Sequence, residues 1–276
     1  MKIAIRSQDL AVDGVDNLIN MLNAYGLDGL QLVCYKTFGN VAYKQGGLPQ
    51  SFIPELKRLA KTTDIFLVGA YFNPVHSDKE KVRKGMEIFK GYLELCAALG
   101  CNIVGSETGS YNDDIWTYHP ENRTEKALIR SAEAFRELCD YAEGCGAYVG
   151  IEGAAGHIAY SPDVLSAMIK MIGRQNIQVI FDLYNYLDDN NHSTYLDILQ
   201  RGLELFKGKI RCFHMKDYTI ENGRLKQVAV GKGMFDYSKI LHLIKRYDDD
   251  AVLVLEGVKG EDIHTAVELI KSLWEK

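Results

Sequence analysis

Short apolar stretches of strand length recur along the chain, with little alternation between polar and apolar residues. They span residues 2–6, 29–33, 64–71, 101–106, 147–152, 177–182, 209–215 and 251–256. Continuous runs of this kind, rich in Val, Ile and Phe, are typical of parallel strands that are covered on both faces. We therefore expect eight parallel strands.

Segments with helical spacing lie between these stretches. Within residues 78–99, apolar side chains recur at steps of three and four: Val82, Met86, Phe89, Leu93 and Cys96. This spacing predicts an amphipathic helix. Residues 123–146 repeat the pattern and end in glycines, and residues 161–173 begin with a Ser cap and a Pro in the first turn. A last helix is expected over residues 261–276, and a loop over about residues 34–50.

Alternation of strand and helix, repeated eight times, predicts an α/β fold of the (β/α)8 TIM barrel type. We expect residues 1–276 to form a single domain, because one such barrel commonly takes about 250 residues. A doubly wound open sheet is the main alternative. It lacks support, since no Gly-x-Gly-x-x-Gly follows the first strand to bind a dinucleotide.

Composition and charge narrow the classes of partner. The formal net charge is -5, with Lys and Arg mixed among Asp and Glu, which argues against a nucleic-acid surface. No apolar run approaches the roughly 20 residues that span a bilayer, and the first residues lack the apolar region of a signal peptide. We expect no membrane partner and a cytoplasmic location. The six cysteines form no Cys-x-x-Cys pair, so we expect reduced core thiols.

Four consecutive strand candidates end in a potential metal ligand: Glu152, Asp182, His214 and Glu256. Chemistry in these barrels takes place where the strands end, so the four side chains should lie on one side of one rim. Three neighbouring carboxylates repel one another unless a cation or protons hold them. Each residue alone has an ordinary explanation as a helix cap, a salt-bridge partner or a core histidine. Together they predict a site for one divalent metal ion (Mn, Mg, Co or Zn).

Other polar residues follow the same strands. Lys216 and Asp217 come after the histidine and could contact substrate, position His214, or form a surface ion pair. Glu107 follows the fourth strand, as a substrate contact or a loop cap. Residues 218–230 could form a small hairpin, and the Gly-Lys-Gly at 231–233 suits either an anionic substrate or a tight turn.

The quoted strand ends also carry a resemblance over nearly the whole chain. The motifs are GIEG at Glu152, FDLYN at Asp182, HMKD at His214, VGKGMFDY at 230–237 and VLEG at Glu256. With them the chain resembles the sugar phosphate isomerase/epimerase family, the xylose isomerase-like TIM barrels of the AP endonuclease family 2 superfamily. The resemblance implies that these four residues bind one divalent metal, and that Glu152 and Glu256 are also the catalytic acid–base pair.

Two departures from the family pattern bear on the substrate. Many ketose epimerases of the family have His where this chain has Asn185, which we take as a candidate substrate contact. Many also follow the first metal-binding Glu with Asn and His, whereas this chain has Gly153 and Ala154. Both changes concern which sugar is bound, and neither touches the metal ligands.

We predict a metal-dependent sugar or sugar phosphate isomerase or epimerase. It would remove a proton next to a carbonyl and pass through a metal-stabilised ene-diolate. A dehydratase of a polyol or keto-inositol uses similar chemistry and is an alternative, as is a non-catalytic sugar-binding protein. Phosphodiester hydrolysis, as in the endonuclease-IV-type relatives, needs more His and Asp ligands than these strand ends offer. The resemblance is also compatible with a homo-oligomer.

Overall fold

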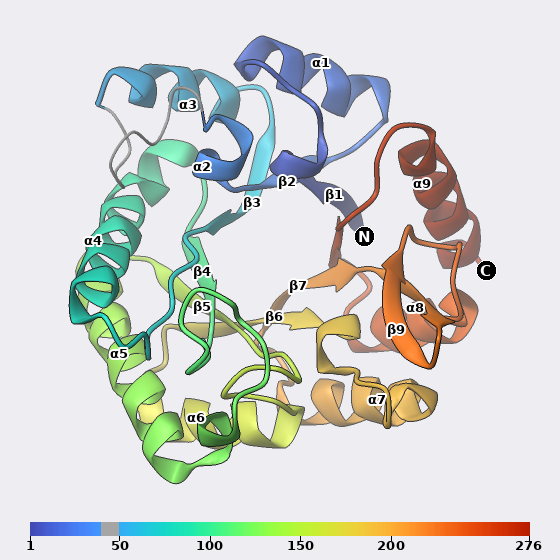
Figure 1. Cartoon of the computed structure of the whole chain (residues 1–276). Coiled ribbons are helices and arrows are strands. Elements are labelled where there is room, and N and C mark those ends of the chain that lie inside the picture. The colour runs from blue at the N-terminus through green and yellow to red at the C-terminus, as the bar shows by residue number, and fades with distance from the viewer. Residues whose placement is uncertain (40–49) are drawn as a thin grey trace.

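A computed structural model describes residues 1–39 and 50–276 of the chain. Within them, eight parallel strands close into a barrel in the order β1-β10-β7-β6-β5-β4-β3-β2 (Figure 1). The strands are β1 (Lys2–Arg6), β2 (Gly29–Leu32), β3 (Asp64–Gly69), β4 (Ile103–Glu107), β5 (Tyr148–Glu152), β6 (Ile177–Asp182), β7 (Ile210–Met215) and β10 (Val252–Leu255). The predicted single-domain TIM barrel is confirmed as to fold, and every predicted strand is present within two residues of its expected ends.

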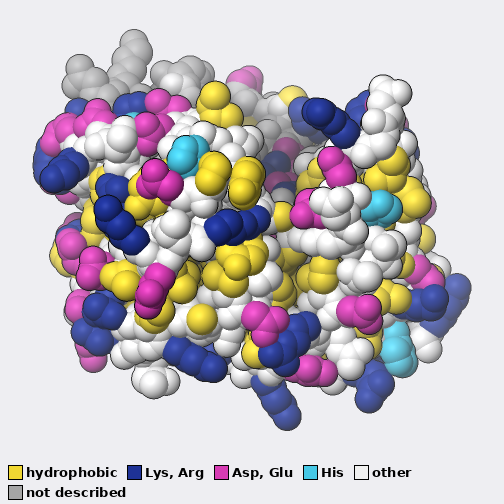
Figure 2. Space-filling view, turned by 60° about the horizontal axis from the view of Figure 1, so that its bottom comes forward, with side chains coloured by type: hydrophobic (Ala, Val, Ile, Leu, Met, Phe, Trp, Pro, Cys, Tyr) yellow, Lys and Arg dark blue, Asp and Glu magenta, His cyan; other side chains and the backbone are white. Residues whose placement is uncertain are grey.

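Helices surround the barrel and cover the outer faces of its strands (Figure 1). They are α1 (Val15–Ala24), α2 (Cys34–Thr37), α3 (Ile53–Ala60), α4 (Lys79–Leu95), α5 (Glu125–Gly144), α6 (Pro162–Ile172), α7 (Tyr195–Leu205), α8 (Tyr237–Tyr247) and α9 (Glu261–Trp274). Of the helices in residues 1–39 and 50–276, none is long and apolar enough to cross a membrane. Charges of both signs are interspersed on the face that Figure 2 shows.

The helix ends follow the local signals in the sequence. Ser161 caps α6 by accepting a hydrogen bond from the Val164 amide, and Gly173 ends it in the left-handed conformation. The helix predicted over residues 78–99 ends at Leu95 and continues as a tighter 3-10 turn over Cys96–Leu99 (η3). The loop expected over residues 34–50 begins with the short helix α2 instead, and residues 40–49 of it lie outside the described part.

A two-stranded antiparallel hairpin follows β7, as the sequence predicts. Its strands are β8 (Asp217–Glu221) and β9 (Arg224–Val228). Asn222 and Gly223 form the turn between them and both have positive φ, a conformation that Asn and Gly adopt more readily than other residues. The hairpin follows the carboxyl end of β7 and therefore lies on the side of the barrel mouth (Figure 1).

Small residues let the barrel interior close around larger neighbours. The Ile180 side chain of β6 packs against Gly105 of β4 and Gly150 of β5; a Cβ on Gly105 would lie 2.4 Å from the Ile180 Cδ1. These contacts fix which residues face inward. Because side chains alternate along a strand, the residues two positions later, including Asp182 and Glu152, face the interior as well.

Candidate active site

Four ionisable side chains meet at the carboxyl ends of adjacent barrel strands. Glu152 and Asp182 end β5 and β6, His214 is the penultimate residue of β7, and Glu256 directly follows β10. The strand pairing places Asp182 beside His214, and the residue two positions before Glu256 beside the same histidine. All four side chains are buried. The structure thus brings together the residues that the sequence predicts to share one site.

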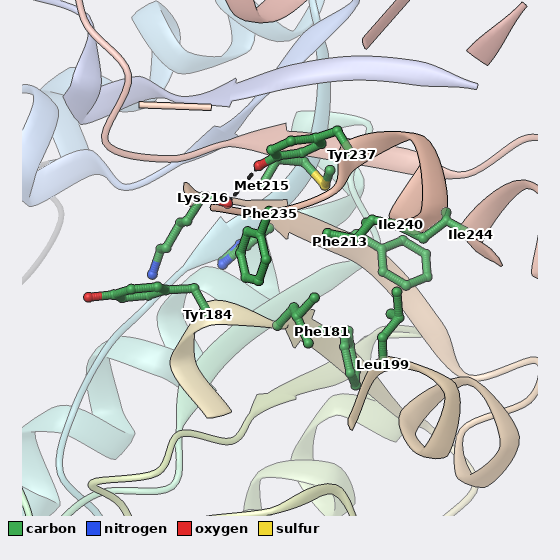
Figure 3. A pocket seen from close by; sticks show the side chains of 12 residues that line it. Phe181, Tyr184, Leu199, Phe213, Met215, Lys216, Phe235, Tyr237, Ile240 and Ile244 are labelled. Carbon is green, nitrogen blue, oxygen red and sulfur yellow. Dashed lines mark hydrogen bonds between the residues drawn. The ribbon is translucent and has the colours of Figure 1, made fainter. Parts of the chain in front are cut away.

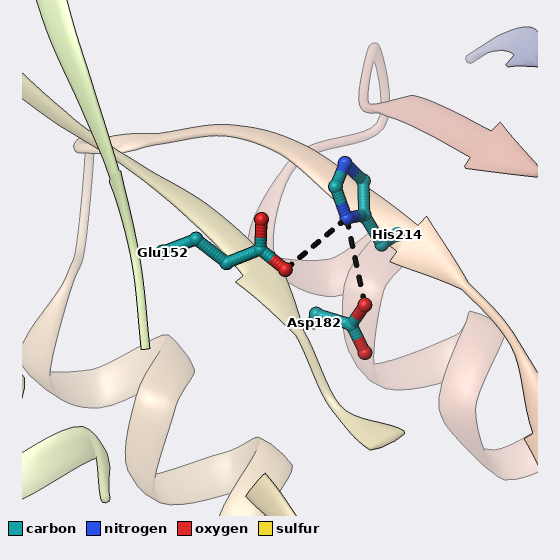
Figure 4. A group of neighbouring side chains, drawn as sticks. All are labelled: Glu152, Asp182 and His214. Carbon is teal, nitrogen blue, oxygen red and sulfur yellow. Dashed lines mark ion pairs between the residues drawn. The ribbon is translucent and has the colours of Figure 1, made fainter. Parts of the chain in front are cut away.

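His214 lies at the centre of this group. Its Nδ1 atom is 3.4 Å from Glu152 Oε1, 3.4 Å from Asp182 Oδ2 and 3.1 Å from Glu256 Oε2. Figure 4 shows the imidazole facing the first two carboxylates. Glu152, Asp182 and His214 each offer a ligand atom within 4.8 Å of the other two, a spacing that could hold a metal ion. Glu256 lies beside this trio rather than within it.

Polar partners behind the histidine fix its orientation. His214 Nε2 lies 2.7 Å from Gln31 Oε1, and Gln31 Nε2 donates a hydrogen bond of 2.6 Å to the Tyr71 hydroxyl. An amide oxygen only accepts, so Nε2 carries the proton in this contact. In the neutral imidazole the Nδ1 lone pair is then directed at the carboxylates, as a metal ligand requires.

The hydrogen bonding of the group fits a cation. Glu152 Oε2 is buried and has no hydrogen-bond partner. Asp182 Oδ2 and His214 Nδ1 are also buried, and their contacts are ion pairs, with Lys216 and with the neighbouring carboxylates. Buried polar atoms are rarely left without a partner, and a divalent ion would provide one for Glu152 Oε2 while it also binds Asp182 and His214. A set of two or three carboxylates and one imidazole suits Mn²⁺, Mg²⁺, Co²⁺ or Zn²⁺. The residues therefore fit the predicted cofactor.

Lys216 supplies a positive charge next to the carboxylates. Its Nζ lies 2.8 Å from Asp182 Oδ2 and 2.5 Å from Glu256 Oε1, and it donates a 2.9 Å hydrogen bond to Asn185 Oδ1. Burial disfavours the ammonium, but attraction to Asp182, Glu256 and Glu152 outweighs it and raises the pKa of Lys216. Asn185 in turn donates a 2.7 Å hydrogen bond to Glu152 Oε1. The amide thus links the lysine to the carboxylate on the other side of the group.

Arg6 holds Glu256 from the opposite side. Its Nη1 lies 2.6 Å from Glu256 Oε1, and its Nε bonds Asp9 Oδ2 at 3.0 Å. Asp9 Oδ2 also accepts a 2.9 Å hydrogen bond from the Gly257 amide. Arg6 of β1 and Asp9 of the following turn therefore position Glu256, which follows the last barrel strand, β10. With Arg6 and Lys216 beside it, Glu256 is held in its ionised form, and its pKa is lowered despite burial.

Glu107 and His157 form a second ionisable pair at the rim. His157 Nδ1 lies 3.2 Å from Glu107 Oε2, and His157 Nε2 lies 3.0 Å from the Trp116 carbonyl oxygen. The carbonyl only accepts, so Nε2 carries a proton, and in the neutral histidine Nδ1 must accept. Burial lowers the pKa of His157 to about 4. Burial and the nearby Glu152 charge raise the pKa of Glu107 to about 8. The pair therefore shares one proton near neutral pH.

The partners of Asp217 are backbone amides of its own loop region rather than groups of the candidate site. Its two carboxylate oxygens accept hydrogen bonds from four backbone amides, those of Tyr218, Gly231, Gly233 and Phe235. These bonds leave the carboxylate fully buried and occupied, which opposes the predicted contact of Asp217 with substrate. The Gly-Lys-Gly segment is a tight turn around this carboxylate: a Cβ on Gly233 would lie 2.2 Å from Asp217 Oδ1.

The space behind Lys216 is packed with apolar side chains. Figure 3 shows Tyr184 beside the lysine and the Tyr237 hydroxyl donating to the Lys216 carbonyl oxygen, at 2.6 Å. The cavity among these residues, between β6, β7 and helices α7 and α8, has a volume of about 20 Å³. It can hold one water molecule at most. Any ligand larger than a water molecule would therefore bind on the mouth side of the carboxylates.

Position 153, where this chain has Gly and many relatives have Asn, has no room for a larger side chain. A Cβ at Gly153 would lie 2.5 Å from the Tyr186 hydroxyl and 2.6 Å from the Ala159 carbonyl oxygen. Tyr186 follows β6 and is buried against the end of β5. Its ring occupies the room that an Asn side chain at position 153 would need.

Several residues of the site were not predicted from the sequence: Arg6, Asp9, Gln31, Tyr71 and the pairing of His157 with Glu107. A signal for two of them was present. Arg6 ends the first apolar stretch and Gln31 interrupts the second, and a polar residue inside a buried strand needs a polar partner. The identity of that partner depends on the strand register.

Comparisons with known proteins identify the fold and the family. The family model described as "Xylose isomerase-like TIM barrel" matches residues 19–273. No curated protein sequence matches the chain.

Three solved structures illustrate the similarity. A D-tagatose 3-epimerase-like protein is 18% identical with a TM-score of 0.78, over 100% of this chain and 97% of the other. The IolI protein with a binding zinc atom is 16% identical with a TM-score of 0.73, over 99% and 96%. The probable 3-DHS dehydratase AsbF of Bacillus anthracis is 16% identical with a TM-score of 0.69, over 100% and 98%.

At these identities the three structures establish the barrel alone, whereas the family match covers most of the chain and includes all four strand-end residues. The chain therefore belongs to the xylose isomerase-like TIM barrel family.

Proposed function

We propose that the protein is a divalent-metal-dependent isomerase or epimerase of a sugar or sugar phosphate. The observation that carries the proposal is the convergence of Glu152, Asp182 and His214 within metal-binding distance of one another, beside Glu256, with one buried Glu152 oxygen that has no hydrogen-bond partner. Repulsion among the carboxylates would oppose folding unless positive charge compensates for it. Lys216 and Arg6 compensate for part of it, and both lie nearest to Glu256 or Asp182 rather than to the unbonded Glu152 oxygen.

These four residues would hold the cation. Bound there, it would act as a Lewis acid that stabilises the negative charge developing next to a sugar carbonyl. The hydrogen bond from His214 to Gln31 keeps the imidazole in the required orientation.

We assign the proton transfers to Glu152 and Glu256. They lie on β5 and on the end of β10, with β6 and β7 between them, so the two carboxylates approach the centre from different sides. One would remove a proton from the carbon next to the carbonyl, and the other would return a proton from the opposite face or to the neighbouring carbon. The first outcome gives an epimer and the second an aldose–ketose isomer.

Three further residues are proposed to bind the sugar. Lys216 and Asn185 form a connected polar surface next to both carboxylates, with donors suited to sugar hydroxyl oxygens. Glu107 lies at the end of the adjacent strand β4, is partly exposed and is paired with the buried His157. Its carboxyl can contact a hydroxyl of the substrate.

A deuterium-exchange experiment tests the proposal. The metal-supplemented protein is incubated in D₂O with a panel of ketoses, aldoses and their phosphates, and deuterium bound to carbon is followed by NMR. We expect exchange next to the carbonyl that stops on chelation. Glu152→Gln and Glu256→Gln should each slow it about 100- to 10,000-fold, the usual contribution of a general acid or base. Glu268→Gln, an exposed change on α9, is the matched control and should leave the rate unchanged.

The same experiment separates the rival functions. The similarity to a structure named as a probable dehydratase supports elimination of water as a second candidate. Loss of a hydroxyl group, seen as a new unsaturated product, would replace our assignment with that one. Binding of a sugar without any exchange would refute both enzymes in favour of a sugar-binding protein. The cytoplasmic location and the homo-oligomer stay predictions.

A further inference from the structure

Two cysteines occupy the ends of a helix-terminating turn at the barrel end opposite the candidate active site. The turn η3 closes at Gly100, which has a φ of 62°. The Cys101 amide donates to the Cys96 carbonyl at 3.1 Å, and the Gly100 amide to the Ala97 carbonyl at 3.4 Å. This pair of bonds defines a Schellman motif, in which the first and sixth residues bring their side chains into contact. Here those two residues are both cysteines.

The next helix provides an internal comparison. Helix α5 ends in the same motif: Gly146 has a φ of 63°, and the Ala147 amide donates to the Ala142 carbonyl at 2.9 Å. The two contacting positions are alanines there. The turn therefore folds without thiols, and the motif itself does not explain why the first turn carries a pair of cysteines.

The environment of this pair favours thiol chemistry. Cys96 and Cys101, both buried, lie with the partly exposed Cys145 and with Arg211 at the wall of one surface cavity of about 430 Å³. Arg211 is anchored by a 3.2 Å hydrogen bond from its Nε to the Phe66 carbonyl oxygen. The hydrogen bond between the two thiols, together with the Arg211 charge, lowers the pKa of Cys101, while the same bond and burial raise the pKa of Cys96. One thiol of the pair is thus the better nucleophile.

We propose that Cys101 and Cys96 form a dithiol site that is oxidised by hydroperoxides to an intramolecular disulfide. All six cysteines are free thiols in the structure, which represents the reduced form of this site. The site is separate from the carboxylate group, since Cys101 precedes β4 while Glu107 ends it. It does not depend on the proposed sugar chemistry.

The reaction has two steps. The Cys101 thiolate attacks one peroxide oxygen, the O–O bond breaks, and the leaving oxygen takes up a proton to give an alcohol or water. This leaves a sulfenic acid on Cys101. The Cys96 sulfur then attacks the Cys101 sulfur; the S–S bond forms, the S–O bond breaks, and water leaves with the Cys96 proton. The two sulfurs lose two electrons, and the peroxide gains them.

The sequence makes the product easy to detect. Trypsin cuts after Lys90 and Arg123, so Cys96 and Cys101 lie on one peptide and Cys145 on another. The folded full-length chain is treated with one equivalent of hydrogen peroxide, then denatured and alkylated. We expect the first peptide to lose two hydrogens and take up no alkyl group, while Cys145 is alkylated fully.

Three variants make the test specific. Cys145→Ala is the matched control from the same cavity and should keep the crosslink. Cys96→Ala should trap the sulfenic acid on Cys101, detected with a 1,3-dicarbonyl probe, and Cys101→Ala should leave Cys96 reduced. Circular dichroism confirms that each variant is folded, as the alanines of the α5 turn lead us to expect. Full alkylation of both cysteines after peroxide, or oxidation of Cys145 in their place, would overturn the proposal.

Discussion

The proton shared by Glu107 and His157 predicts an unusual dependence of stability on pH. In the folded protein the pKa of His157 is lowered from 6.5 to about 4, and the pKa of Glu107 is raised from 4.5 to about 8. Between pH 4 and 8 the folded pair therefore holds one proton, on Glu107. The unfolded chain holds two protons below pH 4.5, one between 4.5 and 6.5, and none above 6.5.

The sign and size follow from these proton counts. Stability rises with pH where the unfolded chain binds more protons and falls where the folded protein binds more. The contribution of the pair is therefore flat between pH 4.5 and 6.5, where both states hold one proton. From pH 6.5 to 8 only the folded pair holds a proton. Over that window the free energy of unfolding should fall by about 2 kcal/mol, at roughly 1.4 kcal/mol for each pH unit.

Urea unfolding of the metal-free protein, in the presence of a chelator, measures this contribution. Glu107→Gln removes the group that keeps the proton, so the decrease above pH 6.5 should disappear relative to wild type. In the same variant the histidine acts alone, and stability should rise between pH 4 and 6.5. In His157→Gln the glutamate acts alone, so the free energy of unfolding should fall with rising pH from about pH 4.5 upward. Other groups titrate in all three proteins and cancel in the differences. Identical pH profiles for wild type and Glu107→Gln would refute the shared proton.

Three further predictions concern single contacts. Gln31→Leu leaves the His214 Nε2–H without its acceptor and should weaken Mn²⁺ binding, measured by calorimetry, about 10- to 100-fold. Gln178→Leu in β6 is the control. Equal Mn²⁺ affinities of Gln31→Leu and wild type would contradict the role of Gln31. Asp217→Ala leaves four backbone amides without their acceptor and should lower the free energy of unfolding, measured in urea, by at least about 3 kcal/mol. A loss below about 1 kcal/mol would mean that water replaces the carboxylate. Gly202→Ala places a Cβ 2.1 Å from the Phe181 ring and should lower the melting temperature, despite the better helix propensity of Ala; an unchanged melting temperature would show that α7 can shift outward.

The fold could be predicted because its signals are local. Each buried strand is a mainly apolar run, and the caps of the helices are residues such as Ser161 whose side chains bond the adjacent turn. The end of α4 differs from the prediction because apolar spacing continues through Cys96 while the backbone tightens to a 3-10 turn. Periodicity reports which side chains are buried, and it does not distinguish these two kinds of turn.

The site could be predicted only in part, for a related reason. The four strand-end residues are visible because each one stands at the end of an apolar run or, for His214, one residue before it. Gln31, Tyr71 and Arg6 act through partners on other strands, and those partners follow from barrel closure and register rather than from spacing along the chain. Asp217 shows the opposite case: a polar residue next to the predicted ligand serves the backbone of a distant turn.

The contact between Asp9 and the Gly257 amide has a consequence for how the protein is made. Its two residues are separated by 248 positions, so this contact forms only after nearly all of the chain between β1 and β10 has been synthesised. Contacts of such long range also form slowly in refolding, because a large loop must close first. A nascent chain would therefore carry Glu152, Asp182 and His214 before Glu256 can join them. The proposed activity should appear as a late event, coincident with barrel closure rather than with the folding of the individual strand–helix units.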